Sequence, residues 1–225
     1  LAGIIFGLKK HFKPTVVILL WMIFPLLVQA EFAKVFTARY LLFVVPFFLI
    51  FVAILTEFIL GKAKFKPLVV FLLLILLFFS LKFDFQLLTN PQKAPLPRRD
   101  REGYLELWTA GFGLREIADY IRIQAKERSV VVGTEGAFGT LPDGLQIYLE
   151  KVPGVVVFGT GQINIYQVPQ SLKDAAKDNL TYLVVNDTRM HAEHDSALVF
   201  LQKFPKAKKP NGTQESLLFY QVVKQ

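Results

Sequence analysis

The residues best placed to do chemistry surround a glycine-rich turn. Gly133, Gly136 and Gly139 follow a buried apolar segment, Glu135 lies between the first two, and Asp143 follows the last. A strand that leads through such a turn into a helix N-terminus presents free N–H groups to an anion. The spacing matches neither a P-loop nor a G-x-G-x-x-G dinucleotide loop. Two interpretations stay open: the glycines serve turn geometry, or Glu135 and Asp143 contact a sugar or another substrate.

A second polar cluster lies in the segment MHAEHD, residues 190–195. It contains four possible metal ligands, His191, Glu193, His194 and Asp195. They lack the H-E-x-x-H spacing that puts two histidines on one helix face. We therefore expect no metal site but a polar loop ahead of a helix, with Asp195 or Ser196 as its N-cap. The chain has no Cys and no G-x-S-x-G elbow, which excludes thiolate metal sites and gives no support for a serine nucleophile.

Arg39 and Tyr40 stand at the beginning of a long apolar segment. An arginine at membrane depth is costly unless it meets an anion, and a lipid phosphate is the anion available at the headgroup level. The alternative is that both side chains anchor a helix at the interface. The sequence favours the two interpretations equally. No other cofactor motif is evident, and a divalent-metal requirement stays open.

The composition divides the chain into two parts. Its 225 residues are 53% hydrophobic with a mean hydropathy of +0.41. Residues 1–84 hold 15 of the 22 Phe and carry 9 Lys and Arg against 3 Asp and Glu. This predicts a transmembrane region over residues 1–85, whose main partner is the lipid bilayer. Because the basic charge belongs to the membrane loops, nucleic acid is not an expected partner.

Apolar runs predict three spans, at about residues 15–30, 40–60 and 68–83. Residues 1–8 are also apolar and are interpreted as the end of a fourth helix, which would make this chain the C-terminal part of a larger protein. Lysines at positions 9, 10 and 13 and at 62, 64 and 66 are expected in the cytoplasm. Everything after the third span is then extracytoplasmic.

A proline-rich linker is predicted over residues 86–102, followed by an α/β domain over 103–225. Helical periodicity is expected at 114–128, 141–150, 172–179 and 196–204, and strands at 129–132, 155–158, 163–168, 182–185 and 217–223. Strands alternating with helices favour an α/β sandwich with a largely parallel sheet. The expected fold is thus a membrane all-α region of three transmembrane helices plus the end of a fourth, followed by this soluble domain.

Two stretches resemble a known superfamily. Residues 38–46 (ARYLLFVVP) resemble the late "RY…P" helix start of membrane glycosyltransferases of the dolichyl-phosphate-mannose protein mannosyltransferase and aminoarabinose transferase type. Residues 111–121 (GFGLREIADYI) and 132–149 (VGTEGAFGTLPDGLQIYL) resemble the C-terminal region of bacterial members. The resemblance covers most of the chain in layout.

The resemblance implies a plasma-membrane enzyme that inverts a sugar's configuration while transferring it. The sugar would move from a polyprenyl-phosphate donor to an extracytoplasmic glycan, lipid or protein acceptor. An acidic general base is expected in a first outer loop upstream of this chain, and Arg39 and Tyr40 near the donor phosphate. The alternative is a non-enzymatic membrane-anchored sensor that binds a ligand at the C-terminal ends of its strands.

Overall fold

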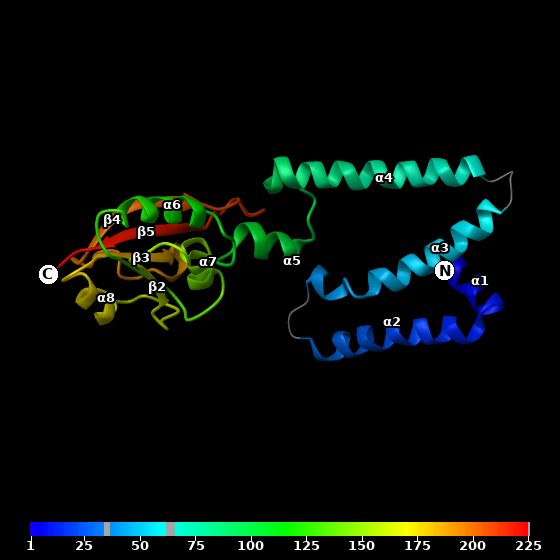
Figure 1. The fold of residues 1–225 in the computed structure, drawn as a ribbon, viewed down its shortest axis with the longest axis horizontal. Helices are drawn as coiled ribbons and strands as arrows, with labels where there is room; N and C mark the ends of the chain where they lie inside the picture. Colours follow the sequence, from blue (N-terminus) through cyan, green and yellow to red (C-terminus); the bar gives the residue numbers. More distant parts are fainter. Residues whose placement is uncertain (34–36, 62–65, 225) are drawn as a thin grey trace. The chain divides into compact units, whose positions relative to one another are not determined.

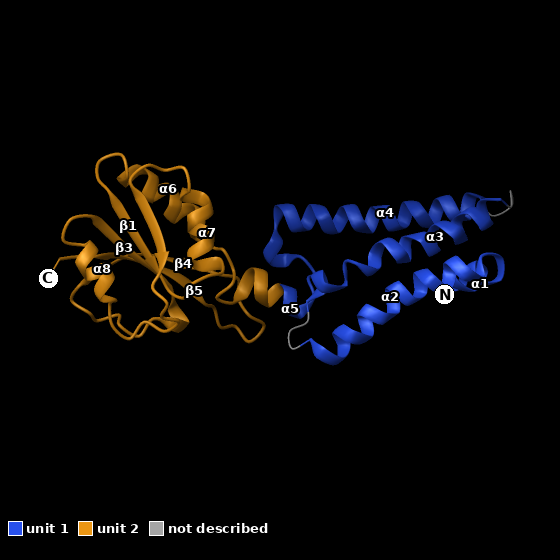
Figure 2. Cartoon of the chain, turned by 60° about the horizontal axis from the view of Figure 1, so that its bottom comes forward, with its two compact units in different colours: residues 1–100 blue, residues 101–225 orange. Residues whose placement is uncertain are grey.

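The computed structural model describes residues 1–33, 37–61 and 66–224. The chain forms two compact units, residues 1–100 and 101–225, which Figure 2 shows in different colours. The first unit contains helices and the second contains a sheet with helices.

The described part of the first unit is helical, with four α-helices before residue 90. They are α1 (Ala2–Lys10), α2 (Phe12–Phe32), α3 (Val44–Leu60) and α4 (Lys66–Thr89), and a 3-10 helix, η1 (Ala38–Leu41), precedes α3. Two glycines let α1 approach its neighbours closely. A Cβ at Gly3 would lie 2.1 Å from the Phe51 carbonyl oxygen in α3, and one at Gly7 would lie 2.9 Å from Thr15 Oγ1 in α2. Small residues allow such close approach between apolar helices.

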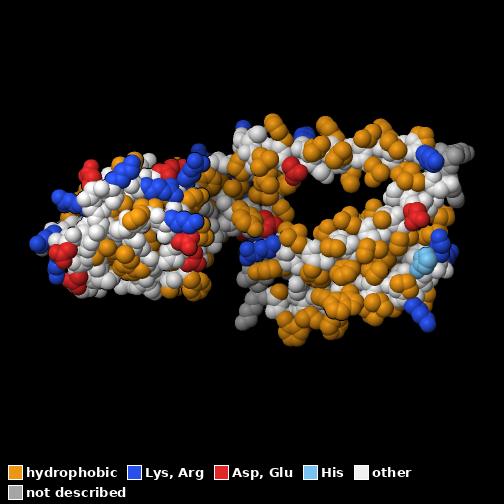
Figure 3. Space-filling view, viewed as in Figure 1, with side chains coloured by type: hydrophobic (Ala, Val, Ile, Leu, Met, Phe, Trp, Pro, Cys, Tyr) orange, Lys and Arg blue, Asp and Glu red, His pale blue; other side chains and the backbone are white. Residues whose placement is uncertain are grey.

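Two of the described helices are long and apolar enough to cross a membrane. They are α2, with 21 residues and a mean hydropathy of 2.0, and α4, with 24 residues and 2.5. Only 6% of each apolar window is buried, and hydrophobic side chains follow the helices in Figure 3. Water solvates so large an apolar surface poorly, which suggests membrane association.

Only two described helices reach spanning length, so the expectation of three spans plus the end of a fourth is not met. The chain at Ala38–Leu41 is a 3-10 helix, so α3 starts at Val44 and has only 17 residues, about 26 Å at ~1.5 Å per residue. Pro46 lies in its first turn, where the missing N–H costs nothing, and a proline deeper in the helix would disrupt it. At the N-terminus, α1 has nine residues and ends at Lys10, and the single residue His11 separates it from α2.

The region predicted as an extended linker is partly helical. Helix α4 continues to Thr89, and the chain then forms a 3-10 turn at Pro91–Lys93. It continues as α5 (Arg98–Arg101) and a π-helical turn (Glu102–Glu106).

The second unit is an α/β fold with a mixed five-stranded sheet. The strands are β1 (Val130–Thr134), β2 (Val155–Gly159), β3 (Leu180–Asn186), β4 (Leu198–Pro205) and β5 (Ser216–Val222). Their order in the sheet is β2-β1-β3-β5-β4. Strand β1 pairs in parallel with β2 and β3, whereas β5 is antiparallel to both β3 and β4. The expectation of a largely parallel sheet is therefore wrong, because the chain returns from β4 to β5 in a hairpin, which makes antiparallel neighbours.

Helices cover both faces of this sheet (Figure 1). Helices α6 (Leu114–Gln124) and α7 (Thr140–Leu149) pack on one face, around Ile117, Leu145 and Tyr182. The short α8 (Gln170–Ala175) packs on the other, around Leu172 and Leu183. The apolar spacing that predicted α6 is confirmed, because its apolar positions at Leu114, Ile117, Ala118 and Ile121 are buried.

Two predicted elements are wrong. The segment expected as a helix from Ser196 is strand β4, and the strand expected at 163–168 is a loop with one isolated bridge, Ile165 to Met190. The error in β4 has a physical cause. A register shift between Phe200 and Gln202 breaks the alternation, so that Leu198, Leu201 and Phe204 are the partly buried positions. A β-bulge thus produced a three-residue period that imitates a helix.

Candidate functional site

A buried polar network lies at one edge of the sheet. Strands β1, β3 and β4 run in the same direction, so their C-terminal ends meet at this edge, beside the beginning of β5. Glu135 follows β1, Asn186 ends β3, and Lys206 follows β4. All three side chains are about 1% exposed. The sheet order therefore brings together groups that are up to 71 residues apart in the sequence.

Glu135 is the centre of the network. Its Oε2 accepts the Asn186 backbone N–H at 2.8 Å. Its Oε1 accepts the Asn186 side-chain amide at 2.6 Å and Arg189 Nη1 at 2.9 Å. Three donors thus surround a carboxylate that water barely reaches. Because the side chain is about 1% exposed, a substrate could contact this carboxylate only if the surrounding protein atoms moved.

Lys206 joins the same network from the other side. Its Nζ donates to the Leu107 carbonyl at 2.9 Å and to Asn186 Oδ1. Asn186 therefore bridges the two buried charges, accepting from Lys206 and donating to Glu135. Since buried ions are tolerated only with such partners, each member depends on the others.

The network also holds a segment near the beginning of the second unit. Besides the Leu107 carbonyl, it engages the Trp108 carbonyl, which accepts Asn186 Nδ2 at 3.4 Å. The Arg189 guanidinium lies 4.1 Å from the centre of the Trp108 ring, a cation–π contact. The Ala207 N–H donates to the Leu105 carbonyl at 2.9 Å. These contacts hold residues 105–108 across the edge of the sheet where the C-terminal ends of β1, β3 and β4 meet.

Burial dominates the electrostatics of both charges. It raises the pKa of Glu135 above its ordinary value, although hydrogen bonds from Asn186 and the charge of Arg189 act in the opposite direction. Burial lowers the pKa of Lys206 to about 8, although the nearby carboxylates of Glu215, Glu135 and Asp187 oppose the shift. Both groups would be more readily charged in water than here. We call the network of Glu135, Asn186, Arg189 and Lys206 the clamp, because it joins the strand ends to residues 105–108. Its charged groups are costly to bury.

The glycine-rich turn serves geometry and packing. Gly136 and Gly139 have φ values of 70° and 103°, which favour glycine. Gly133 lies within β1, where a Cβ would come 2.6 Å from Leu172 Cδ2 of α8. These observations support the first of the two interpretations for the glycines.

The structure does not bring the two predicted substrate contacts, Glu135 and Asp143, into one site. Asp143 is exposed, and its Oδ2 accepts the Gly139 N–H at 2.8 Å, at the beginning of α7. The N-cap of α7 is Gly139, and the hydroxyl of the next residue, Thr140, donates to the Thr109 carbonyl at 2.9 Å. Glu135 is occupied in the buried network.

Arg39 and Tyr40 lie together on η1, in the first unit. Both side chains are exposed. Arg39 Nη2 lies 3.5 Å from the Tyr40 hydroxyl, and the guanidinium is 5.2 Å from the ring centre. The pair therefore forms one cationic and aromatic surface immediately before α3.

The 190–195 segment is a polar loop, but it precedes a strand. Asp195 accepts the N–H groups of Ala197 at 2.9 Å and Val168 at 3.3 Å, and Lys173 Nζ lies 3.6 Å away. The predicted N-cap at Asp195 is thus a loop cap, since β4 follows it. Within residues 1–33, 37–61 and 66–224, no three His, Cys, Asp or Glu side chains are grouped to hold a metal ion.

Sequence reasoning found Glu135 but missed its partners. Asn186 and Arg189 belong to a polar segment, NDTR, at the C-terminal end of the buried β3, and that position was a usable signal. Lys206 gave none, because a lysine after an edge strand is ordinarily exposed. Comparisons with protein-family models, curated proteins and solved structures find no match to this chain.

Proposed function

We propose that this chain is the C-terminal part of a plasma-membrane glycosyltransferase. It would move a sugar from a polyprenyl-phosphate donor to an acceptor outside the cytoplasm, with Arg39 and Tyr40 at the donor phosphate. The observation that carries the proposal is the exposed Arg39–Tyr40 pair at the beginning of an apolar helix. The resemblance to membrane glycosyltransferases includes these two residues.

The charge distribution supports an extracytoplasmic second unit. Lysines cluster around the beginnings of both long apolar helices: Lys9, Lys10 and Lys13 for α2, and Lys62, Lys64 and Lys66 for α4. Short basic segments beside membrane helices remain in the cytoplasm. Both long helices would then begin inside the cell, and the shorter apolar α3 between them would bring the chain back across the membrane. The residues after α4 would lie outside.

The proposed chemistry divides into two parts. A general base removes the proton of the acceptor hydroxyl, and a cation stabilises the charge that develops on the leaving phosphate. Arg39 would supply the second part, with its planar guanidinium matched to phosphate oxygens. The base is assigned to an acidic first outer loop of the longer protein, because Glu135 is enclosed by its own hydrogen bonds.

The alternative of an anchored binding protein requires an open crevice at the carboxyl ends of the strands. In sheets of this kind that crevice lies where the strand order reverses, which here is between β1 and β3. Glu135, Asn186 and Arg189 fill this place. No observation at this crevice favours the alternative.

Donor binding tests the role of Arg39. The chain in lipid nanodiscs is titrated with undecaprenyl phosphate, and binding is followed by native mass spectrometry. Arg39→Ala should weaken the affinity about tenfold, the value of a charged hydrogen bond, and Arg39→Lys should recover part of it. Lys82→Ala, which removes another exposed cation of the first unit, should have no effect. Equal losses for Arg39→Ala and Lys82→Ala, or none for either, would contradict the phosphate role and support interfacial anchoring.

A further inference from the structure

The loop between β2 and α8 is fixed in place by backbone hydrogen bonds. Near its start, the Gly161 N–H donates to the Gly136 carbonyl at 2.9 Å, and the Gly136 N–H donates to the Gln162 carbonyl at 2.8 Å. Further along, Ile165 is bonded on both sides, its N–H to Arg189 at 2.8 Å and its carbonyl to the His191 N–H at 2.9 Å. Ile165 is fully buried, whereas the side chains on either side of it are exposed. The loop is therefore a preformed surface.

This loop borders a wide-open hollow of about 560 Å³ on the surface. The residues that line it are Gly161, Gln162, Ile163, Asn164, Tyr166 and Gln167. None of these six is charged. Gln162, Asn164 and Gln167 are exposed. Their side-chain amides make no hydrogen bond within the described part of the chain. Three side chains that both donate and accept are thus gathered in one small area.

Tyr166 gives the hollow an aromatic platform. Its ring stacks on His191, with centroids 4.7 Å apart and planes inclined by 13°. The side chain is nevertheless 70% exposed, so the other face of the ring is open. Ile163, 60% exposed, adds apolar surface beside it. Stacking on His191 orients the ring before any ligand arrives, which lowers the entropy lost on binding.

The lining defines the chemistry of a ligand. An anion or a cation would find no opposite charge among the six lining residues. A wholly apolar ligand would cover the amides without giving them partners, which costs free energy. A pyranose ring fits both features, because its C–H face is apolar and its hydroxyl groups both donate and accept.

We infer that the hollow over residues 161–167 binds a neutral sugar unit of a glycan, with the ring on Tyr166 and the hydroxyl groups on the amides. One part of the inference rests on the proposed transferase function, namely that the bound neutral glycan is the acceptor of the transferred sugar. The binding itself requires no transfer reaction.

The test measures oligosaccharide binding to the full chain in nanodiscs. Maltotriose, mannotriose and chitotriose are titrated by calorimetry, and saturation-transfer NMR identifies the bound sugar. At least one trisaccharide should bind, and Tyr166→Ala should weaken it about fivefold, the range of one aromatic contact. Tyr166→Phe keeps the ring and should retain most of the affinity. Gln162→Ala combined with Asn164→Ala should also weaken binding.

Tyr148→Ala is the matched control, because it removes an exposed tyrosine of α7 that does not line the hollow. Thermal unfolding of every variant confirms that it is folded. The inference is overturned if no trisaccharide binds, if Tyr148→Ala and Tyr166→Ala weaken binding equally, or if a sulfated disaccharide binds more tightly than the neutral sugars. Binding only to a polyprenyl-phosphate sugar, and not to free glycans, would overturn the acceptor assignment. A chain that binds glycan at Tyr166 but transfers no sugar would keep this site and refute the transferase.

Discussion

Replacing Glu135 by glutamine tests the buried network most sharply. The substitution keeps the size of the side chain but turns one of the two oxygens into an N–H donor. That donor then faces Asn186 or Arg189, each of which is itself a donor at this position. Arg189 also loses the carboxylate 2.9 Å away.

The expected cost is about 3 kcal/mol, from a lost charged hydrogen bond and a buried charge left without its counter-ion. For a unit of this size, 1 kcal/mol lowers the melting temperature by roughly 4 °C, so we expect a fall of about 12 °C. The assay is the thermal unfolding of the second unit in the full chain, followed by near-ultraviolet circular dichroism.

Glu150→Gln is the control, since Glu150 is exposed at the end of α7, and it should melt within about 1 °C of the wild type. A Glu135→Gln protein that also melted within about 1 °C would refute the clamp. If it kept the wild-type melting temperature but lost sugar transfer, Glu135 would be a substrate contact instead.

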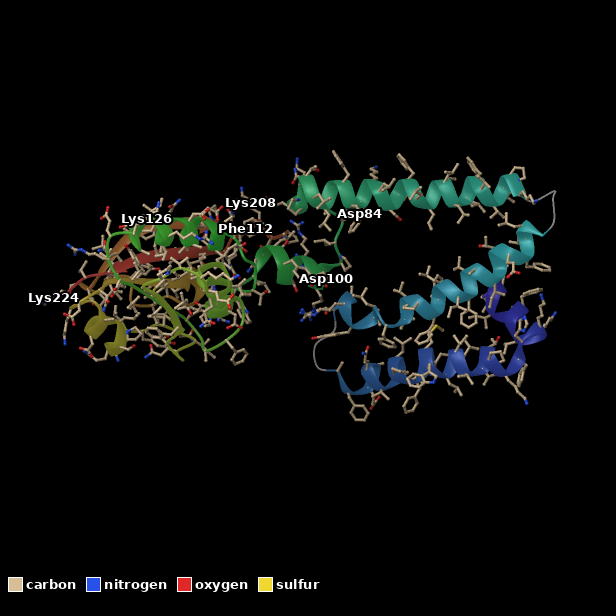
Figure 4. The ribbon with its side chains drawn as sticks, viewed as in Figure 1. Asp84, Asp100, Phe112, Lys126, Lys208 and Lys224 are labelled. Carbon is tan, nitrogen blue, oxygen red and sulfur yellow. The ribbon has the colours of Figure 1, made fainter. Side chains whose placement is uncertain are left out.

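Three further predictions concern other parts of the chain. The pKa of Lys206 falls from 10.5 in the unfolded chain to about 8 in the fold, so between these pH values the unfolded state binds more protons and stability rises with pH. Relative to Lys206→Met, the wild type should gain on the order of 3 kcal/mol from pH 8 to 10.5 in denaturant titrations, and a constant difference would contradict the buried lysine. Gly133→Ala should lower the free energy of unfolding by about 2 kcal/mol in the same titrations, because its Cβ would lie 2.6 Å from the buried Leu172 side chain. An unchanged midpoint would mean that α8 does not pack closely on β1. The chain has no Cys, so a single introduced cysteine reports which side of the membrane it is on. Lys126→Cys, at an exposed position of the second unit (Figure 4), should react with a membrane-impermeant maleimide in intact bacterial cells, whereas Lys13→Cys should not. The reverse pattern would invert the proposed orientation.

Local patterns predicted the elements whose packing follows local rules. The apolar spacing from Leu114 to Ile121 gave α6, because a helix that covers a sheet buries one stripe. The buried apolar runs in β1 and β3 gave central strands. Strand β4 was missed because a bulge at an edge strand changed the period of its buried positions. No periodicity rule detects a register shift in advance.

The site was only partly predictable because its members meet through the sheet order. The sequence indicated Glu135 as a candidate site residue because it lies in the turn after β1. Asn186 and Lys206 join it because β3 lies beside β1 and because β4 runs parallel to β3 across β5. A largely parallel sheet with a helix in place of β4 would have put Lys206 elsewhere. The membrane region differed from its prediction because the length of an apolar run does not reveal a 3-10 helix such as the one before α3.

A sugar-transfer assay tests the proposed function most directly. The protein expressed from its complete coding sequence is reconstituted in nanodiscs with radiolabelled polyprenyl-phosphate sugars and neutral glycan acceptors. Our account predicts release of polyprenyl phosphate, a product whose new linkage has the inverted configuration, and a loss of about tenfold in turnover for Arg39→Ala. Binding of glycan without any release of polyprenyl phosphate from the labelled donors would contradict it.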